Sequence, residues 1–152
     1  MNRPYFDTGL VLKLVISEPL SAKVHEFLQK RGVPVPYTRL VELELENTLH
    51  AKIFRRELTA KQLGLCREFL SQLVRDGKFS RHRLSWEEVM LEAMELMPEI
   101  TASTGCRTLD LLHVVSARKL GFREFVTGDR RQAAAARRCG LKAVEISARQ
   151  TS

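Results

Sequence analysis

The segment from Thr108 to Leu120 is the strongest constraint on the fold, because it has helical periodicity and is apolar on nearly every side. A helix of this kind must be covered by other elements, so it is expected at the centre of the protein. Gly121 ends the helix. The run from Glu124 to Thr127 follows and is interpreted as a short strand.

Short strands and longer helices are predicted along the rest of the chain. The predicted strands cover residues 5–6, 33–37, 124–127 and 141–146. The predicted helices cover residues 17–32, a stretch after residue 38, residues 60–75, 86–100 and 108–120, and a basic stretch that follows a turn at Gly128 and runs through Arg138. This order calls for parallel strands joined by crossover helices. The expected fold class is α/β, a Rossmann-like three-layer sandwich with a central parallel sheet flanked by helices.

The length and composition fit one domain that covers residues 1–152. A chain of 152 residues with 44% apolar content can bury a core without disulfides. The apolar runs are much shorter than a membrane span requires, and the first residues lack the pattern of a secretory signal. We therefore predict a cytoplasmic protein that makes no membrane contact. The cysteines Cys66, Cys106 and Cys139 are widely spaced and are expected to be reduced thiols.

Four acidic residues stand where such a fold brings them to one edge of its sheet. Asp7 follows the first strand and Asp129 follows strand 124–127, and ligands of parallel sheets bind beyond the carboxyl ends of the strands. Glu44 and Asp110 lie in apolar helical patterns, where an unpaired carboxylate is costly to bury. Carboxylates that share a cleft repel one another unless they take up protons or bind cations. All-oxygen ligation favours Mg²⁺ or Mn²⁺ over zinc.

Three of these acids also have an ordinary structural explanation. Asp7 and Asp129 can cap helices, and Asp110 can lie in the first turn of its helix. His113, on the same helical stripe as Asp110, is interpreted as a core or supporting residue rather than a ligand. The prediction of a metal site rests on the convergence of the acids and not on any one of them.

Periodicity leaves the glutamate of the site undecided. Glu42 and Glu44 flank the apolar stripe of their helix on opposite sides, whereas Glu46 points further out. The helical pattern disfavours Glu46 weakly and does not choose between the other two.

The net charge of +7 favours a polyanionic partner, because neutralising phosphates releases counterions. An acidic cleft within a basic protein indicates phosphodiester hydrolysis, in which a divalent ion activates water and stabilises charge on the phosphate. There are only two tyrosines and one tryptophan, so stacking on bases is expected to contribute little. Trp86 is interpreted as a packing residue.

The acidic residues lie in recognisable motifs. These are Tyr5-Phe6-Asp7-Thr8, Leu43-Glu44-Leu45-Glu46-Asn47-Thr48-Leu49, Asp110-Leu111-Leu112-His113-Val114 and Thr127-Gly128-Asp129-Arg130-Arg131-Gln132. In this order, and across nearly the whole chain, they resemble the PIN-domain nucleases, most closely the VapC-type toxins of bacterial and archaeal toxin–antitoxin pairs.

The resemblance implies a single PIN domain, a PIN-like fold, RNA as substrate, a homodimer, and an antitoxin partner that blocks the groove. It implies Mg²⁺ or Mn²⁺ as cofactor, and the residues that it assigns to catalysis and metal binding are Asp7, Glu44, Asp110 and Asp129, with Thr8 and Thr127 in support. The family's glutamate lies three residues before an Asn or a similar residue, and Glu44 has this relation to Asn47. The family usually has Ser where this chain has Gly9, so a hydroxyl near the first carboxylate is missing.

Basic residues near the motifs are expected to contact RNA phosphates. They are Lys13, Arg130 and Arg131. Arg137 and Arg138 are explained equally well as a solvated helix face.

Other functions fit the sequence less well. A phosphatase of the haloacid dehalogenase kind would need an acid at position 9, where this chain has Gly9, and a receiver domain would need adjacent acids that the chain lacks. The alternative from another class is a catalytically weak or silent RNA-binding module with a regulatory role. The four acids argue against a silent module, because a protein without a metal site has no physical need to keep carboxylates that repel one another.

Overall fold

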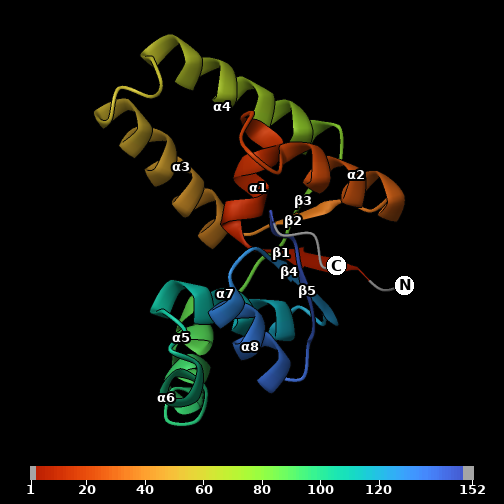
Figure 1. The fold of residues 1–152 in the computed structure, drawn as a ribbon, viewed down its shortest axis with the longest axis vertical. Helices are drawn as coiled ribbons and strands as arrows, with labels where there is room; N and C mark the ends of the chain where they lie inside the picture. Colours follow the sequence, from red (N-terminus) through yellow and green to blue (C-terminus); the bar gives the residue numbers. More distant parts are fainter. Residues whose placement is uncertain (1–2, 149–152) are drawn as a thin grey trace.

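Parallel strands organise residues 3–148, the part of the chain that the computed structural model describes (Figure 1). One sheet has the order β1-β4-β5, and a second sheet pairs β2 with β3. The strands are β1 (Pro4–Phe6), β2 (Val35–Tyr37), β3 (Phe79–Arg81), β4 (Glu124–Thr127) and β5 (Lys142–Glu145). β2 also lies beside β1, although no ladder of hydrogen bonds joins the two sheets in the described residues.

Helices cover both faces of these strands. Figure 1 shows α1, α2 and α4 on one side and α5 to α8 on the other, with α3 and α4 extending away as a pair. The helices are α1 (Thr8–Val15), α2 (Ser21–Arg31), α3 (Arg39–Phe54), α4 (Ala60–Arg75), α5 (Trp86–Leu96), α6 (Ile100–Thr104), α7 (Thr108–Lys119) and α8 (Arg130–Arg138). The protein is therefore α/β, as predicted, and its layout is compatible with a Rossmann-like fold. The hydrogen-bonded central sheet, with three strands, is smaller than expected.

Successive side chains of β1 and β4 point to opposite faces of the sheet and contribute to two hydrophobic cores. Tyr5 pairs with Phe125 in register, and both rings are fully buried in the core that faces α7. Their ring centroids lie 5.6 Å apart in a stacked arrangement. Phe6 and Val126, one residue further along each strand, point into the opposite core with α1 and α3. Successive strand residues face opposite sides of a sheet, so two three- or four-residue strands supply both cores.

The central helix and most of the strands match the predictions. α7 is buried from Leu111 to Ala117, as its apolar pattern predicted. Thr59 and Gln62 form the complete capping box expected at the start of α4. Ser85 caps α5 through the backbone N–H of Glu88 over 3.4 Å.

Two predicted helices need correction, and the predictions omitted α1 and β3. The helix predicted for residues 17–32 begins only at Ser21, because Leu20 adopts a left-handed conformation with φ 76°. The preceding residues form a turn in which Glu18 N donates to Ser21 Oγ over 2.9 Å, and α1 occupies the apolar stretch before it. The helix predicted for residues 86–100 ends at Leu96 and is followed by the short α6. The strand β3 was not predicted at all.

No helix within residues 3–148 is long and apolar enough to cross a lipid bilayer. The cysteines Cys66, Cys106 and Cys139 are free thiols, as expected.

Candidate metal centre

A cleft of about 500 Å³ opens beyond the carboxyl ends of β1 and β4. β1 has β2 on one side and β4 on the other, so the direction in which successive strands are added reverses at β1. Ligands of parallel sheets bind at such a reversal point. All the predicted acids line this cleft: Asp7, Glu44, Asp110 and Asp129. Thr8, Lys13, Arg107, His113 and Gln132 also line it.

Asp7 is the most buried of these carboxylates, with 9% of its surface exposed. It follows β1 directly and caps α1, because its Oδ1 accepts a hydrogen bond of 2.8 Å from Leu10 N. The Thr127 hydroxyl contacts its Oδ2, and Gly128 N lies 3.4 Å from the same oxygen. Burial raises the pKa of Asp7 above its ordinary value, although the bonds from Thr127 and Leu10 oppose this shift. The capping explanation and the site prediction are thus both compatible with the position of Asp7.

Thr127 connects Asp7 to the start of α8. Its Oγ1 lies 2.7 Å from Gln132 Oε1 and accepts a hydrogen bond of 3.0 Å from Asp129 N. The Gln132 side-chain amide donates to the carbonyl oxygen of Asp110 over 3.2 Å, which fixes its orientation. Because the Thr127 hydroxyl has a single proton, it cannot donate to both Gln132 and Asp7. When Gln132 Oε1 accepts that proton, the contact with Asp7 is a hydrogen bond only if Asp7 is protonated and donates to Thr127 Oγ1. Burial, which raises the pKa of Asp7, favours this protonated form.

Glu44 is held by side chains from α1 and α7. Its Oε1 accepts a hydrogen bond of 2.8 Å from Thr8 Oγ1 and contacts His113 Nε2. His113 is buried, as expected, and its Nδ1 lies 2.9 Å from the Tyr5 hydroxyl. Burial alone would raise the pKa of Glu44. The hydrogen bonds from His113 and Thr8, together with the positive charge of Arg107, outweigh burial and lower this pKa.

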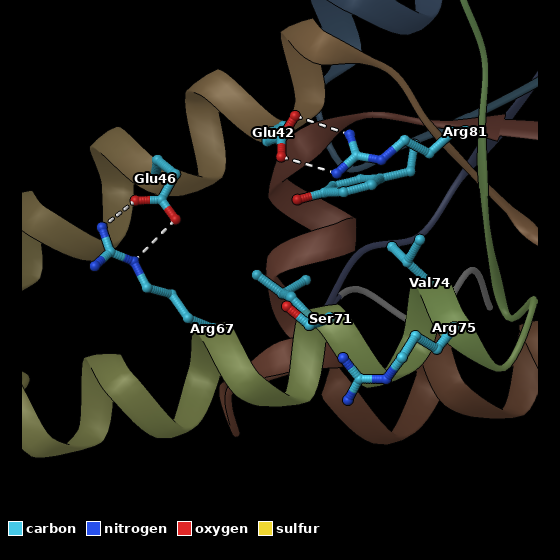
Figure 2. A pocket seen from close by; sticks show the side chains of 9 residues that line it. Glu42, Glu46, Arg67, Ser71, Val74, Arg75 and Arg81 are labelled. Carbon is cyan, nitrogen blue, oxygen red and sulfur yellow. Dashed lines mark hydrogen bonds and ion pairs between the residues drawn. The ribbon is translucent and has the colours of Figure 1, made fainter.

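The other two glutamates of α3 lie outside the cleft. Glu42 forms a bidentate pair with Arg81, over 2.9 and 3.0 Å. Glu46 pairs with Arg67 over 2.8 and 3.2 Å. Figure 2 shows both pairs around a separate hollow of about 440 Å³ between α3 and α4. Of the three candidates, Glu44 is therefore the one that lines the cleft.

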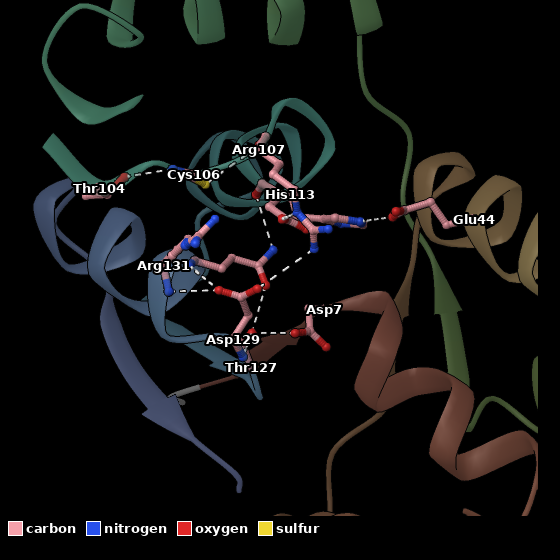
Figure 3. Close-up of polar contacts among 11 residues, drawn as sticks. Asp7, Glu44, Thr104, Cys106, Arg107, His113, Thr127, Asp129 and Arg131 are labelled. Carbon is pink, nitrogen blue, oxygen red and sulfur yellow. Dashed lines mark hydrogen bonds and ion pairs between the residues drawn. The ribbon is translucent and has the colours of Figure 1, made fainter. Parts of the chain in front are cut away.

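Arg107 bridges the two remaining carboxylates, as Figure 3 shows for Asp129. Its Nε donates to Asp110 Oδ2 over 3.0 Å, and its Nη2 lies 3.8 Å from Asp129 Oδ2. Asp129 Oδ1 meanwhile caps α8 by accepting from Arg131 N over 2.7 Å and from Gln132 N over 3.0 Å. Sequence reasoning missed Arg107. The available signal was a basic residue one helical turn before Asp110.

The carboxylates share one cleft, but they are engaged separately. Within residues 3–148, no three acidic, histidine or cysteine side chains lie close enough together to form a set of metal ligands. Asp7 contacts Thr127, Glu44 contacts His113, and Arg107 lies between Asp110 and Asp129.

The basic residues predicted to bind RNA occupy different positions. Lys13 lines the cleft, and its Nζ lies 3.1 Å from Glu18 Oε2. Arg130 and Arg131 are exposed at the start of α8, beyond the residues that line the cleft.

Comparison of the chain with models of protein families finds no match, and comparison with curated proteins finds no significant match.

Proposed function

We propose that this chain is a Mg²⁺- or Mn²⁺-dependent endoribonuclease with a PIN-like fold, and the toxin of a type II toxin–antitoxin pair. The observation that carries the proposal is the convergence of Asp7, Glu44, Asp110 and Asp129 on one cleft from four separate elements of the chain. Clefts at the strand ends of parallel sheets commonly bind ligands. Carboxylates that gather there need a counter-charge.

The chemistry of the donors fits a hard divalent ion. The acids of the cleft offer only oxygen atoms, which Mg²⁺ and Mn²⁺ prefer, and the three cysteines lie outside its walls. Asp7, Glu44, Asp110 and Asp129 would hold the ion. When bound, such an ion lowers the pKa of water and neutralises charge that develops on a phosphate during in-line attack.

The surrounding residues position these ligands. Thr127 and Gln132 fix Asp7 at the end of β1, and Thr8 and His113 orient Glu44 from two helices. Side chains held in this way lose little entropy when they bind a ligand, so the site is partly pre-organised. Lys13 reaches the same cleft and is suited to contact a phosphate of the substrate.

RNA is the proposed substrate because the protein carries a net charge of +7 while its cleft is acidic. Arg130 and Arg131, exposed at the start of α8, would extend the contact to the RNA backbone.

A homodimer and an antitoxin are the proposed protein partners, and the cytoplasm is the proposed location. An apolar hollow of about 640 Å³ supports an interface with another protein. It is lined by side chains of α3, α5 and α7, and Leu43, Met90 and Leu109 leave 65%, 51% and 45% of their surfaces exposed there.

A catalytically silent RNA-binding module is the second candidate, and the contacts of Arg107 favour it. Arg107 already pairs with Asp110 and Asp129 and offsets part of their charge, and no complete ligand set is formed within the described residues. The same basic exterior would then bind RNA without cutting it.

Sequencing of RNA 5′ ends after brief expression in cells separates the two functions. A nuclease generates new 5′ ends with the wild-type chain and loses them with Asp110→Asn, which removes one carboxylate charge from the cleft. A silent module gives the same 5′ ends with both proteins. That result would exclude the nuclease.

A further inference from the structure

Arg107 places a positive charge beside two acids of the proposed centre. Its guanidinium contacts Asp110 over 3.0 Å and lies 3.8 Å from Asp129. It thus pairs with two of the four acids of the cleft. Figure 3 shows its side chain extending from the start of α7 towards Asp129.

The backbone of Arg107 is held by α7, whereas its side chain is largely exposed. The carbonyl oxygen of Arg107 accepts the first hydrogen bond of α7, from Leu111 N over 2.9 Å. The side chain is 74% exposed and provides no side-chain cap for the helix. Exposed ion pairs of this kind are weak and exchange readily with solvent. A rotation about the side-chain bonds of Arg107 is therefore enough to release both carboxylates.

We infer that Arg107 is a built-in counter-ion, which pairs with Asp110 and Asp129 in the metal-free protein and leaves them when a divalent ion binds. The inference rests on the proposed metal centre and adds a regulating residue to it. The guanidinium relieves the repulsion between the acids when no ion is bound. Metal binding must displace it, so Arg107 lowers the affinity of the centre for metal and favours an empty site at low metal concentration.

Calorimetric titration with Mn²⁺ tests this role through binding alone. Arg107→Gln removes the guanidinium and leaves the backbone of α7 unchanged. Two exposed ion pairs are lost, so the variant is expected to bind Mn²⁺ about three-fold to ten-fold more tightly than the wild type. Lys13→Gln is the matched control, because Lys13 carries the same charge in the same cleft but pairs with Glu18. Its affinity should change by less than about two-fold.

A second measurement follows the side chain of Arg107 itself. In nitrogen-15-labelled protein with EDTA, the Arg107 Nε–H group is hydrogen-bonded to Asp110, so its NMR chemical shift should differ from that of a solvated arginine. Saturating Mg²⁺ should move this signal to the shift of a solvated arginine. A general effect of charge on metal affinity would leave the signal unchanged.

The outcomes separate this inference from the proposed function. Equal Mn²⁺ affinity of wild type and Arg107→Gln, or an equal gain in Lys13→Gln, overturns the role of Arg107 and leaves the metal centre intact. An Arg107 Nε–H signal that Mg²⁺ does not change also overturns it. If none of the three proteins binds Mn²⁺, the metal centre fails, and the inference fails with it.

Discussion

Thr8 donates a hydrogen bond of 2.8 Å from its Oγ1 to Oε1 of Glu44, and this bond joins the first turn of α1 to α3. The same hydroxyl oxygen lies 3.1 Å from His113 Nε2. The carboxylate of Glu44 is therefore held from two sides, by residues separated from it by 36 and 69 positions in the chain.

Loss of the Thr8 hydroxyl should destabilise the protein. Thr8→Val keeps the shape of the side chain but leaves Glu44 without one of its donors. Hydrogen bonds to charged groups typically contribute about 1.5–3 kcal/mol, so the free energy of unfolding in urea should fall by about that amount. Thr8→Ser retains the hydroxyl and serves as the control. Equal stability of the Val and Ser variants would show that the bond to Glu44 contributes nothing.

Asp7 should make the metal-free protein less stable as the pH rises. Burial raises the pKa of Asp7 above its unfolded value, so the folded state holds this proton more tightly than the unfolded chain. The resulting stability is present at low pH and is lost as the pH increases through the raised pKa. Asp7→Asn has no proton to lose. In EDTA, its free energy of unfolding should exceed that of the wild type by an amount that grows as the pH rises above about 4. A constant difference would contradict this account.

Glu44 should show the opposite pH dependence. Its pKa is lowered because the donors His113 and Thr8 outweigh burial. The charged form therefore stabilises the folded state above the unfolded pKa, and this contribution is lost as the pH falls through the lowered pKa. Glu44→Gln should be less stable than the wild type at neutral pH, with a difference that shrinks in acid. A difference that widens in acid would rule out the contacts described for Glu44.

Gly9→Ser should strengthen metal binding. A Cβ atom at Gly9 would lie 3.6 Å from Asp7 Oδ1, an ordinary contact, so a serine fits beside the carboxylate. Gly9→Ala is the control, because either residue stabilises helix α1 by about 0.5–1 kcal/mol relative to glycine. Calorimetry should show tighter Mn²⁺ binding for the Ser variant alone. An equal gain in both variants would assign the effect to the helix and not to the hydroxyl.

The sequence predicted the elements whose burial pattern is strong. α7 is apolar on nearly every side, and β1 and β4 coincide with short apolar runs, so their positions followed from the sequence pattern. The carboxyl ends of these strands then placed Asp7 and Asp129 at one edge of the sheet, and both line the cleft. Periodicity did not choose Glu44 over Glu42. The bidentate pair of Glu42 with Arg81 explains its absence from the cleft, and this pair depends on β3.

The elements that were missed depend on contacts between distant residues. β3 has only three residues, and it is a strand because Phe79 to Arg81 pair with Val35 to Tyr37. Arg107 and Asp110 form an ion pair between residues three positions apart. Arg39 and Glu42 form a pair with the same spacing, and this pair lies outside the cleft. Such spacing is common on helices and gave no reason to select Arg107. Only the position of Asp129, brought in from the end of β4, distinguishes the two arginines.

Cleavage of a labelled RNA by the purified protein tests the central claim most directly. We expect cleavage with Mg²⁺ or Mn²⁺, none in excess EDTA, and a loss of about a hundred-fold or more in Glu44→Gln and Asp110→Asn. Glu46→Gln, on the same helix as Glu44 but outside the cleft, should cleave as the wild type does. Full activity in EDTA or in either cleft variant, or no cleavage by the wild type with either ion, would contradict the account.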